Sequence, residues 1–422
     1  MKDGLLHQKY IRASKQECIG RIIAGYENKT GDLSIRKLEK VCLTPRGACP
    51  YIVPDSNLLI DDCDYVAEIS QESTENGMLE GKTLYGGFYR REWGHFLLNT
   101  TARLWPIYNS KINLSDFERI VFFVPDNDPV NVKGNFQEFF KLAGISEKVV
   151  LLESKTCFEE LYIPDLAFEF MLSYSNEFMG IFDCVRNRAL SVNKQYFNKS
   201  NNLLLSRAHL SSCRGRQINI EYIDRLFAEN GFEIIYPEEI TLTELICKMD
   251  RANRIMTYSG STAHNLILAS DASYVVLERS AATNMPQIGV FLAKTCDNVT
   301  LVDVAYHPLI TSSSDPLAIY GLTAYLKTFI EDSDYCMPAD FDSMFCPKKE
   351  LKEYMKYHKR YYGYKMGFNE WESIQYNAII DAYYESLPRY RKWLGCQSPL
   401  RFLDWFSPRI LYRIIKRVIT RF

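Results

Sequence analysis

A turn rich in glycine, serine and threonine joins an apolar strand-like run at 254–258 to a helical pattern at 263–269. The turn reads Ser259-Gly260-Ser261-Thr262. A helix that begins after such a turn leaves backbone N–H groups free at its positive end, and these favour an anion such as phosphate. The next expected strand ends on Glu278, about where nucleotide-binding sheets place the acid that holds ribose hydroxyls. The turn predicts a nucleotide site, with an ordinary strand-to-helix connection as the alternative.

A second candidate site lies at 86–105, where a Gly-Gly loop leads into an apolar helical pattern. Glu92, His95, Asn99 and Arg103 are spaced three or four residues apart, so they would share one face of a helix. A histidine with an ordinary pKa near ~6.5 can accept a proton at neutral pH, which suits activation of a hydroxyl group. A structural histidine at the junction of loop and helix is the alternative.

The elements that must position these residues alternate between strand and helix. In the first half, strands are expected at 119–124 and 149–152 around a helix at 136–142; in the second, strands at 202–206, 232–236, 254–258 and 274–278 alternate with helices at 220–229, 241–252 and 263–269. Such repeats predict a parallel sheet whose ligands bind beyond the carboxyl ends of the strands. Arg207, Gly260 and Glu278 fall at those ends.

The totals limit the class of protein. A chain of 422 residues predicts two domains, and 47% hydrophobic with 24% charged residues is ordinary for a globular protein. The formal net charge of −2 gives no basic field for nucleic acid. No apolar leader and no run of eighteen apolar residues is present, and the 12 cysteines contain no Cys-x-x-Cys pair. We therefore expect a cytoplasmic protein with reduced thiols.

Further short motifs follow one another between residues 85 and 280. They are His-Phe-Leu-Leu-x-x-x-x-Arg-Leu at 95–104, Leu-Ser-Arg at 205–207, Arg-x-x-Asn at 216–219, Gly-Phe at 231–232, Pro-Glu-Glu at 237–239, Gly-x-x-x-x-Asn at 260–265 and Val-Leu-Glu at 276–278. In this order they resemble glycosyltransferase family 61, which includes capsule and lipopolysaccharide sugar transferases of bacteria.

The resemblance implies an α/β protein of GT-B type, in which two Rossmann-like domains face each other across a cleft. The expected boundaries are an acceptor-side domain at 1–198, a nucleotide-sugar-binding domain at 199–334 and a helical extension at 335–422. It also implies an inverting transfer from a nucleotide-sugar donor to a glycan hydroxyl, with neither a metal nor another cofactor.

The resemblance also assigns roles to residues. His95 would be the base, with Glu92 as the second candidate, and Asn99 and Arg103 would lie on the acceptor side. The donor would be bound by Arg207, Arg216, Ser259, Gly260, Ser261, Thr262, Asn265 and Glu278, with the two arginines neutralising the diphosphate.

Three positions depart from the family. Asn99 stands where the family usually has an acid, Ser259 where it has a histidine and Ile220 where it has a glutamate. The departures at Asn99 and Ser259 favour an alternative, a catalytically silent relative that binds nucleotide sugar or glycan within an assembly complex.

Three aspartate clusters offer a rival, because Asp-x-Asp pairs bind manganese in metal-dependent sugar transferases. They are Asp61-Asp-Cys-Asp64, Asp126-Asn-Asp128 and Asp332-Ser-Asp334. Short acidic motifs occur often by chance in a chain with 52 acids, so no metal site is expected.

The end of the chain, 407–422, has five basic residues and no acid. Its isoleucine, leucine and valine residues would occupy one side of a helix and its basic residues the other. This pattern predicts a helix lying on an anionic membrane surface, with packing against the first domain as the alternative. We therefore expect a peripheral protein on the inner face of the cell membrane, where its glycan acceptor can be lipid-linked.

Overall fold

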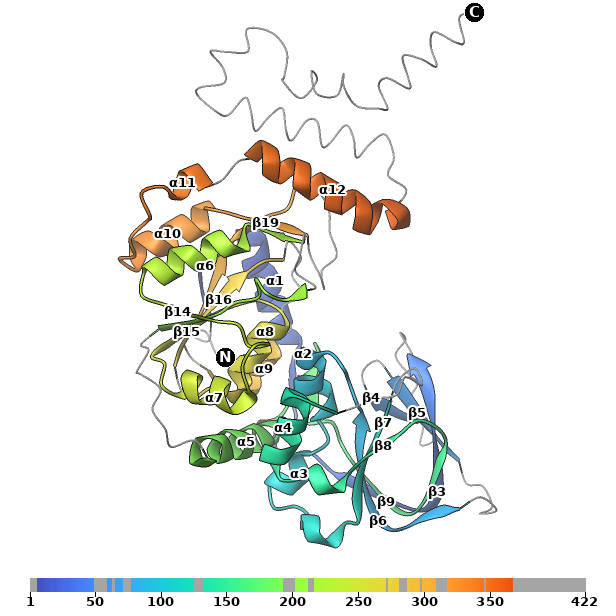
Figure 1. The fold of residues 1–422 in the computed structure, drawn as a ribbon. Helices are drawn as coiled ribbons and strands as arrows, with labels where there is room; N and C mark the ends of the chain where they lie inside the picture. The colour runs from blue at the N-terminus through green and yellow to red at the C-terminus, as the bar shows by residue number, and fades with distance from the viewer. Residues whose placement is uncertain are drawn as a thin grey trace, which may run out of the picture.

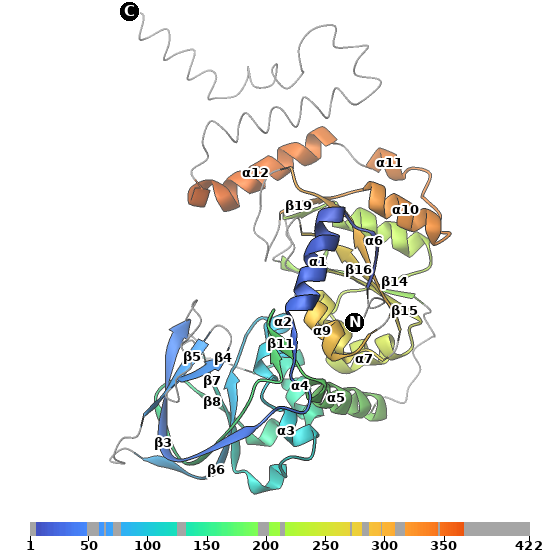
Figure 2. The ribbon, with the colours of Figure 1, turned by 180° about the vertical axis from the view of Figure 1, so that it is seen from behind.

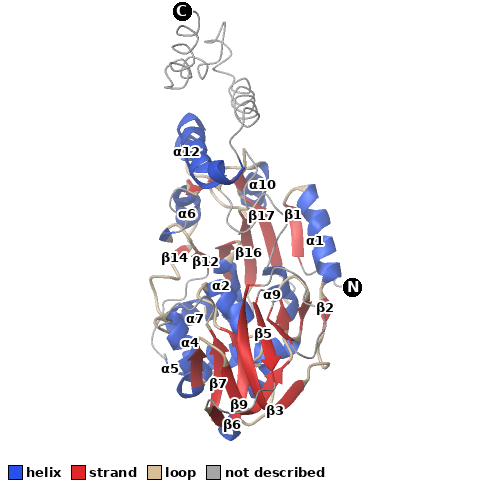
Figure 3. Ribbon diagram, turned by 90° about the vertical axis from the view of Figure 1, so that its right-hand side faces the viewer, coloured by secondary structure: helices blue, strands red, loops and turns tan. Residues whose placement is uncertain are grey.

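The computed structural model describes residues 6–48, 59–62, 65–70, 77–124, 132–192, 202–211, 216–270, 272–280, 287–296, 298–308, 317–344 and 347–366. Within them the chain forms an α/β protein with two large sheets and helices packed around them (Figure 1; Figure 3). Two further sheets have three strands each, in the orders β10-β11-β2 and β13-β19-β18.

The second half is built on a six-stranded sheet in the order β1-β17-β16-β15-β12-β14, in which every pair is parallel. Its strands are β1 (Leu6–Tyr10), β12 (Asn202–Leu205), β14 (Glu233–Ile235), β15 (Arg254–Tyr258), β16 (Ser273–Glu278) and β17 (Val299–Asp303). Its helices include α6 (Ile220–Glu229), α7 (Leu242–Asp250), α8 (Ser261–His264), the 3-10 helix η7 (Asn265–Leu268), α9 (Gln287–Ala293) and α10 (Ala324–Asp332). The predicted alternation and the parallel sheet are confirmed.

The first strand of the chain lies in this sheet of the second half. β1 pairs with β17, and α1 (Ala13–Gly25) follows it beside the same half (Figure 2). The chain then returns to the first half. A single boundary at residue 198 would assign β1 and α1 to the first half, although β1 lies in the sheet of the second. The domain limits themselves remain a prediction.

The first half is built on a seven-stranded mixed sheet in the order β4-β5-β3-β9-β6-β7-β8. Its strands are β3 (Ile35–Ala48), β4 (Leu59–Asp62), β5 (Tyr65–Ser70), β6 (Met78–Phe88), β7 (Arg119–Phe123), β8 (Val149–Leu152) and β9 (Thr156–Pro164). β7 and β8 confirm the two predicted strands, and they are parallel to their neighbours. β3 pairs antiparallel with both β5 and β9, so the sheet of this half is mixed rather than parallel throughout.

The expectation of reduced thiols is wrong for one pair of cysteines. Cys42 on β3 and Cys157 on β9 face each other in the antiparallel register and form a disulfide, across 115 residues of sequence. Disulfides persist mainly in oxidising compartments.

The two halves share a hydrophobic core. One buried cluster contains Phe96 and Phe139 from the first half together with Leu245 and Leu266 from the second. The first-half helices α4 (Asn135–Ala143) and α5 (Met179–Val192) pack against α7. The position of one half relative to the other is therefore set by close packing as well as by the connecting chain.

A glutamate of the first half caps a helix of the second. The Glu138 carboxylate accepts hydrogen bonds from the backbone N–H groups of Leu242 (2.9 Å) and Thr243 (3.0 Å) at the start of α7. Thr241, the N-cap residue of α7, accepts from the N–H of Glu244 at 3.1 Å. Two side chains from different halves thus satisfy the first turn of one helix.

The last described helix is α12 (Pro347–Met366), preceded by the short α11 (Phe341–Met344). The predicted amphipathic helix at 407–422 lies outside the described residues. In the described part of the chain, no helix combines the length and the apolar character needed to cross a bilayer.

We predict that Glu138→Ala lowers the free energy of unfolding by about 2 kcal/mol, because it leaves charge-assisted bonds at the α7 terminus unmade. Urea unfolding measures the change. Glu138→Gln, which still accepts through its amide oxygen, should lose less, and the exposed Glu147→Ala serves as control. An unchanged stability of Glu138→Ala would contradict the capping role.

Candidate functional site

The glycine turn lies at the carboxyl end of β15. Ser259 donates its backbone N–H to the carbonyl of Leu277 at 3.0 Å, which fixes the turn beside the end of β16. Gly260 has φ 104° and ψ −156°, a conformation that is essentially confined to glycine. The next residue, Ser261, begins α8 and is exposed.

Two arginines converge on Gly260. A Cβ atom at this position would lie 2.6 Å from Nη2 of Arg279 and 3.2 Å from Nη1 of Arg207. Arg207 is 6% exposed and Arg279 5%. Two buried guanidinium groups beside one glycine form a positive site where the backbone can approach an anion closely.

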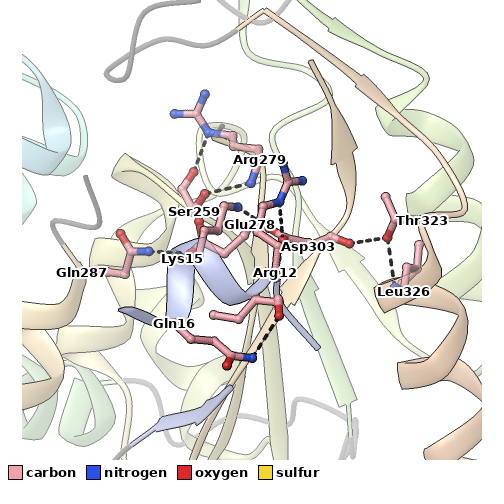
Figure 4. Close-up of polar contacts among 11 residues, drawn as sticks. Arg12, Lys15, Gln16, Ser259, Glu278, Arg279, Gln287, Asp303, Thr323 and Leu326 are labelled. Carbon is pink, nitrogen blue, oxygen red and sulfur yellow. Dashed lines mark hydrogen bonds and ion pairs between the residues drawn. The ribbon is translucent and has the colours of Figure 1, made fainter. Parts of the chain in front are cut away.

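Local bonds hold both arginines. Nη1 of Arg207 donates to Oγ1 of Thr262 at 3.3 Å. The side-chain Nε of Arg279 donates to the carbonyl of Ser259 at 2.6 Å, and its backbone N–H donates to Oγ of Ser259 at 3.2 Å (Figure 4). Arg279 was missed by the sequence analysis, although it directly follows Glu278 at the end of a predicted strand.

Glu278 is buried within the protein. Its side chain is 1% exposed and accepts a hydrogen bond from Nε2 of Gln287 at 2.7 Å. Burial raises the pKa of Glu278, and the charge of Lys15 nearby lowers it in part. The ribose-binding role of Glu278 stays a prediction.

A buried ion cluster stands beside Glu278 (Figure 4). Lys15 and Arg12, from the start of α1, both pair with Asp303 at the end of β17; the Arg12 Nε–Asp303 Oδ2 distance is 2.9 Å. The N-terminal segment thereby brings two cations to the carboxyl end of the second-half sheet.

Arg216, the other predicted diphosphate residue, lies at the start of β13 (Gln217–Ile218). Its backbone carbonyl accepts from the N–H of Ala318, beside β19 (Ala318–Tyr320). The observed pair of guanidinium groups at the turn is thus Arg207 and Arg279, and a role for Arg216 remains a prediction.

The segment 86–105, here called the histidine segment, does not form one continuous α-helical face. α2 (Trp93–His95) passes into a π-helix, η1 (Phe96–Thr100), which changes the spacing of side chains. His95 keeps Asn99 as a neighbour, with 2.9 Å between Nδ1 and Oδ1.

The two other members of the predicted face lie apart from this pair. Glu92 precedes α2, its side chain is 63% exposed and it lies 3.7 Å from Nε of Arg90. Arg103 is buried and donates to the carbonyl of Pro164, with its guanidinium 5.6 Å from the centre of the Tyr85 ring. The acceptor-side role expected for Arg103 stays a prediction.

The histidine segment and the glycine turn are in direct contact. A Cβ atom on Gly94 would lie 2.6 Å from Nδ1 of His264 and 2.9 Å from Oγ of Ser261. Trp93 donates its indole N–H to Oδ1 of Asn265 at 2.8 Å. The structure therefore brings together the two segments that the sequence singled out separately, and glycine at 94 permits the close approach.

His264 is the buried residue at this contact. Burial, and secondarily the charge of His95 nearby, lowers the pKa of His264 to about 3. The His264 ring is therefore neutral at physiological pH, packed against the backbone of the histidine segment.

A pocket of about 700 Å³ opens beside the contact. Its walls come from both halves and include Tyr89, Trp93, Phe136, Glu238, Ser261, Thr262 and Asn265. Partial burial raises the pKa of Glu238. The predicted base His95 is not among the described residues that line this pocket.

Of the three aspartate clusters, only Asp332-Ser-Asp334 lies wholly within the described residues. No group of three or more His, Cys, Asp or Glu side chains there is placed to hold a metal ion. Asp332 accepts hydrogen bonds from Lys9 (2.5 Å) and Tyr10 (2.8 Å). Asp64 and the cluster at 126–128 lie outside the described residues.

Residues 93–276, which begin at Trp93 and include both segments of the site, match the sequence profile of the family Glycosyltransferase 61. This part of the chain belongs to glycosyltransferase family 61. The match supports a glycosyltransferase in general, and the predicted resemblance is confirmed. No curated protein matches the chain.

We predict that the buried neutral His264 makes the fold sensitive to acid. Its pKa is lower in the folded than in the unfolded chain, so it takes up a proton on unfolding; the destabilisation begins below the unfolded pKa of ~6.5 and grows until the folded pKa of about 3 is reached. At pH 5 it amounts to about 2 kcal/mol.

Urea unfolding at pH 7.5 and pH 5 tests this expectation. His264→Gln should remove about 2 kcal/mol of the fall in stability between the two pH values. The exposed His7→Gln should leave the fall as it is. An identical fall in wild type and His264→Gln would contradict the neutral state.

Proposed function

We propose that the chain is an inverting glycosyltransferase that moves a sugar from a nucleotide-sugar donor to a glycan hydroxyl during synthesis of a surface polysaccharide such as capsule or lipopolysaccharide. The convergence of Arg207 and Arg279 on Gly260 carries the proposal. This positive site lies at the carboxyl end of a parallel sheet, where open α/β sheets bind their ligands, and inside the family 61 region.

The proposed chemistry is direct displacement at the anomeric carbon. As the bond to the donor's diphosphate breaks, negative charge develops on the leaving oxygen. The two guanidinium groups would stabilise that charge through preorganised hydrogen bonds, since both are already held in place by the turn. Backbone N–H groups at Ser261 and Thr262 would add to this effect.

The proposed architecture is of GT-B type, with the donor bound by the second half and the acceptor by the first. The parallel sheet of the second half and the pocket between the halves support this arrangement. Asn265 would orient the contact through Trp93. His95, supported by Asn99, remains a candidate base, and Glu92, Arg103, Arg216 and Glu278 keep their proposed roles without a contact that assigns them.

A silent relative that binds nucleotide sugar without transfer is the second candidate. One observation favours it: His95 is bonded to the neutral amide of Asn99. A carboxylate at that position would stabilise the protonated imidazole, whereas an amide supplies orientation without charge. Donor binding without turnover would identify this case.

The location proposed from the sequence is the inner face of the cell membrane, held by residues 407–422. The disulfide between Cys42 and Cys157 favours an oxidising compartment instead. Thiol labelling of the protein purified from its host under alkylating conditions would distinguish the two, because a cytoplasmic pool keeps this pair reduced.

We predict that Arg279→Ala and Arg207→Ala each weaken binding of a nucleoside diphosphate by roughly tenfold to a hundredfold, equivalent to about 1.4–2.8 kcal/mol. Titration calorimetry with UDP, GDP, ADP and CDP measures the change. Arg279→Lys should restore little affinity, because an ammonium group lacks the planar fork of guanidinium.

Arg225→Ala is the matched control. It removes an arginine from the exposed surface of α6, where Arg225 pairs with Glu229 and Asp340. Its affinity should equal that of the wild type. Failure of every nucleoside diphosphate to bind, or equal affinity in all the variants, would overturn the proposed donor site.

A further inference from the structure

From the first half, the pocket is lined by three aromatic side chains, Tyr89, Trp93 and Phe136, and by two cations, Arg91 and Lys133. The second half contributes Leu210, Pro237 and Glu238, and the start of α8 adds a polar wall of Ser261 and Thr262. Its volume of about 700 Å³ lies within the range of small-molecule sites. The polar wall adjoins the Gly260 turn, so a molecule in the pocket would lie next to a donor held there.

Trp93 is fixed in place before any ligand arrives. Its ring stacks on Phe96 with 5.5 Å between centroids and 16° between planes, and it meets the Phe136 ring edge-on at 5.2 Å. Its N–H is bonded to Asn265. A preorganised indole costs little side-chain entropy on binding, and its apolar face suits the C–H face of a sugar ring.

Glu238 lines the same pocket, and its neighbour Glu239 has a different environment. Glu239 pairs with Nδ1 of His209 at 2.6 Å, and this histidine stacks on Tyr236. The Glu238 side chain is solvent-exposed and lines the pocket, so an acceptor hydroxyl there can reach its carboxylate. Partial desolvation raises the pKa of Glu238, whereas the charges of His209 and Arg207 lower it.

His95 is less suited than Glu238 to act as the base for a molecule in this pocket. Its Nδ1 is engaged by Asn99, and its ring lies beside Phe170, 6.2 Å between centroids. Trp93 and His95 are two residues apart on the short helix α2, so their side chains leave it on nearly opposite sides.

Resting on the proposed function, we propose that this pocket is the acceptor subsite, with Trp93 as the platform for the acceptor sugar and Glu238 as the base. The acceptor hydroxyl oxygen forms the new bond to the anomeric carbon of the donor while its proton passes to the Glu238 carboxylate. The bond from that carbon to the diphosphate breaks, and the nucleoside diphosphate leaves with the electron pair. The configuration at the carbon is inverted.

Acceptor binding is tested separately from donor binding. The full chain, saturated with the nucleoside diphosphate that calorimetry identifies, is mixed with methyl glycosides of glucose, galactose, mannose, xylose and N-acetylglucosamine, and saturation-transfer NMR detects bound sugar. At least one glycoside should show transfer to wild type. Trp93→Ala should abolish it with the nucleoside diphosphate affinity unchanged, and Trp93→Tyr should retain part of it.

The base is tested by turnover. Release of nucleoside diphosphate from nucleotide sugars, with the bound glycoside as acceptor, should fall at least about a hundredfold in Glu238→Gln, with both ligands still bound. Glu239→Gln is the matched control and should keep wild-type turnover. His95→Gln, the rival base, should keep more than a tenth of it.

Each outcome is decisive for this inference. No glycoside signal from wild type, or an equal signal from Trp93→Ala, overturns the acceptor subsite. Wild-type turnover in Glu238→Gln, loss in His95→Gln alone, or no turnover by wild type with any donor overturns the base. Because nucleoside diphosphate binding is measured first, its absence marks a failure of the proposed function rather than of the subsite.

Discussion

Two like charges held over one glycine are the constraint around which this site is organised. The guanidinium groups of Arg207 and Arg279 are almost fully buried, where the repulsion between them is weakly screened. Buried charges of one sign are stable only where opposite charge or hydrogen-bond acceptors surround them. The protein supplies the carbonyl of Ser259 and the hydroxyl of Thr262 as acceptors, and the charges of Glu278 and Glu238 act on Arg279 and Arg207 respectively.

The shared core makes that site depend on both halves. Gly94 brings the histidine segment against α8, and a larger residue there would separate Trp93 from Asn265. Glu138 caps α7 from the first half. A rigid junction of this kind suits the proposed transfer reaction, because a reactive site must hold its groups within about 0.5 Å of the productive geometry.

The N-terminal segment adds a further link. β1 closes one edge of the six-stranded sheet, and the helix after it delivers Lys15 and Arg12 to Asp303, next to the buried Glu278. Asp303 pairs with both cations, and the charge of Lys15 also acts on Glu278. The cluster therefore supports the ends of β16 and β17, from which Arg279 projects.

The sequence by itself determined the features that arise from neighbouring residues. The apolar runs predicted β7, β8, β12, β15 and β16, and the turn at Gly260 predicted the helix that begins after it. The order of the motifs also identified the family, because order and spacing along the chain can be read without knowing the fold.

Only the tertiary structure decided which distant groups meet. Arg279 lies beside Arg207 at Gly260, a π-helix interrupts the predicted histidine face, and Cys42 meets Cys157 across an antiparallel pair. The strand β1 joined the sheet of the far half. These contacts depend on how sheets and helices pack. The hydrophobic periodicity of one segment shows which face is buried, but it does not show which other segment packs against that face.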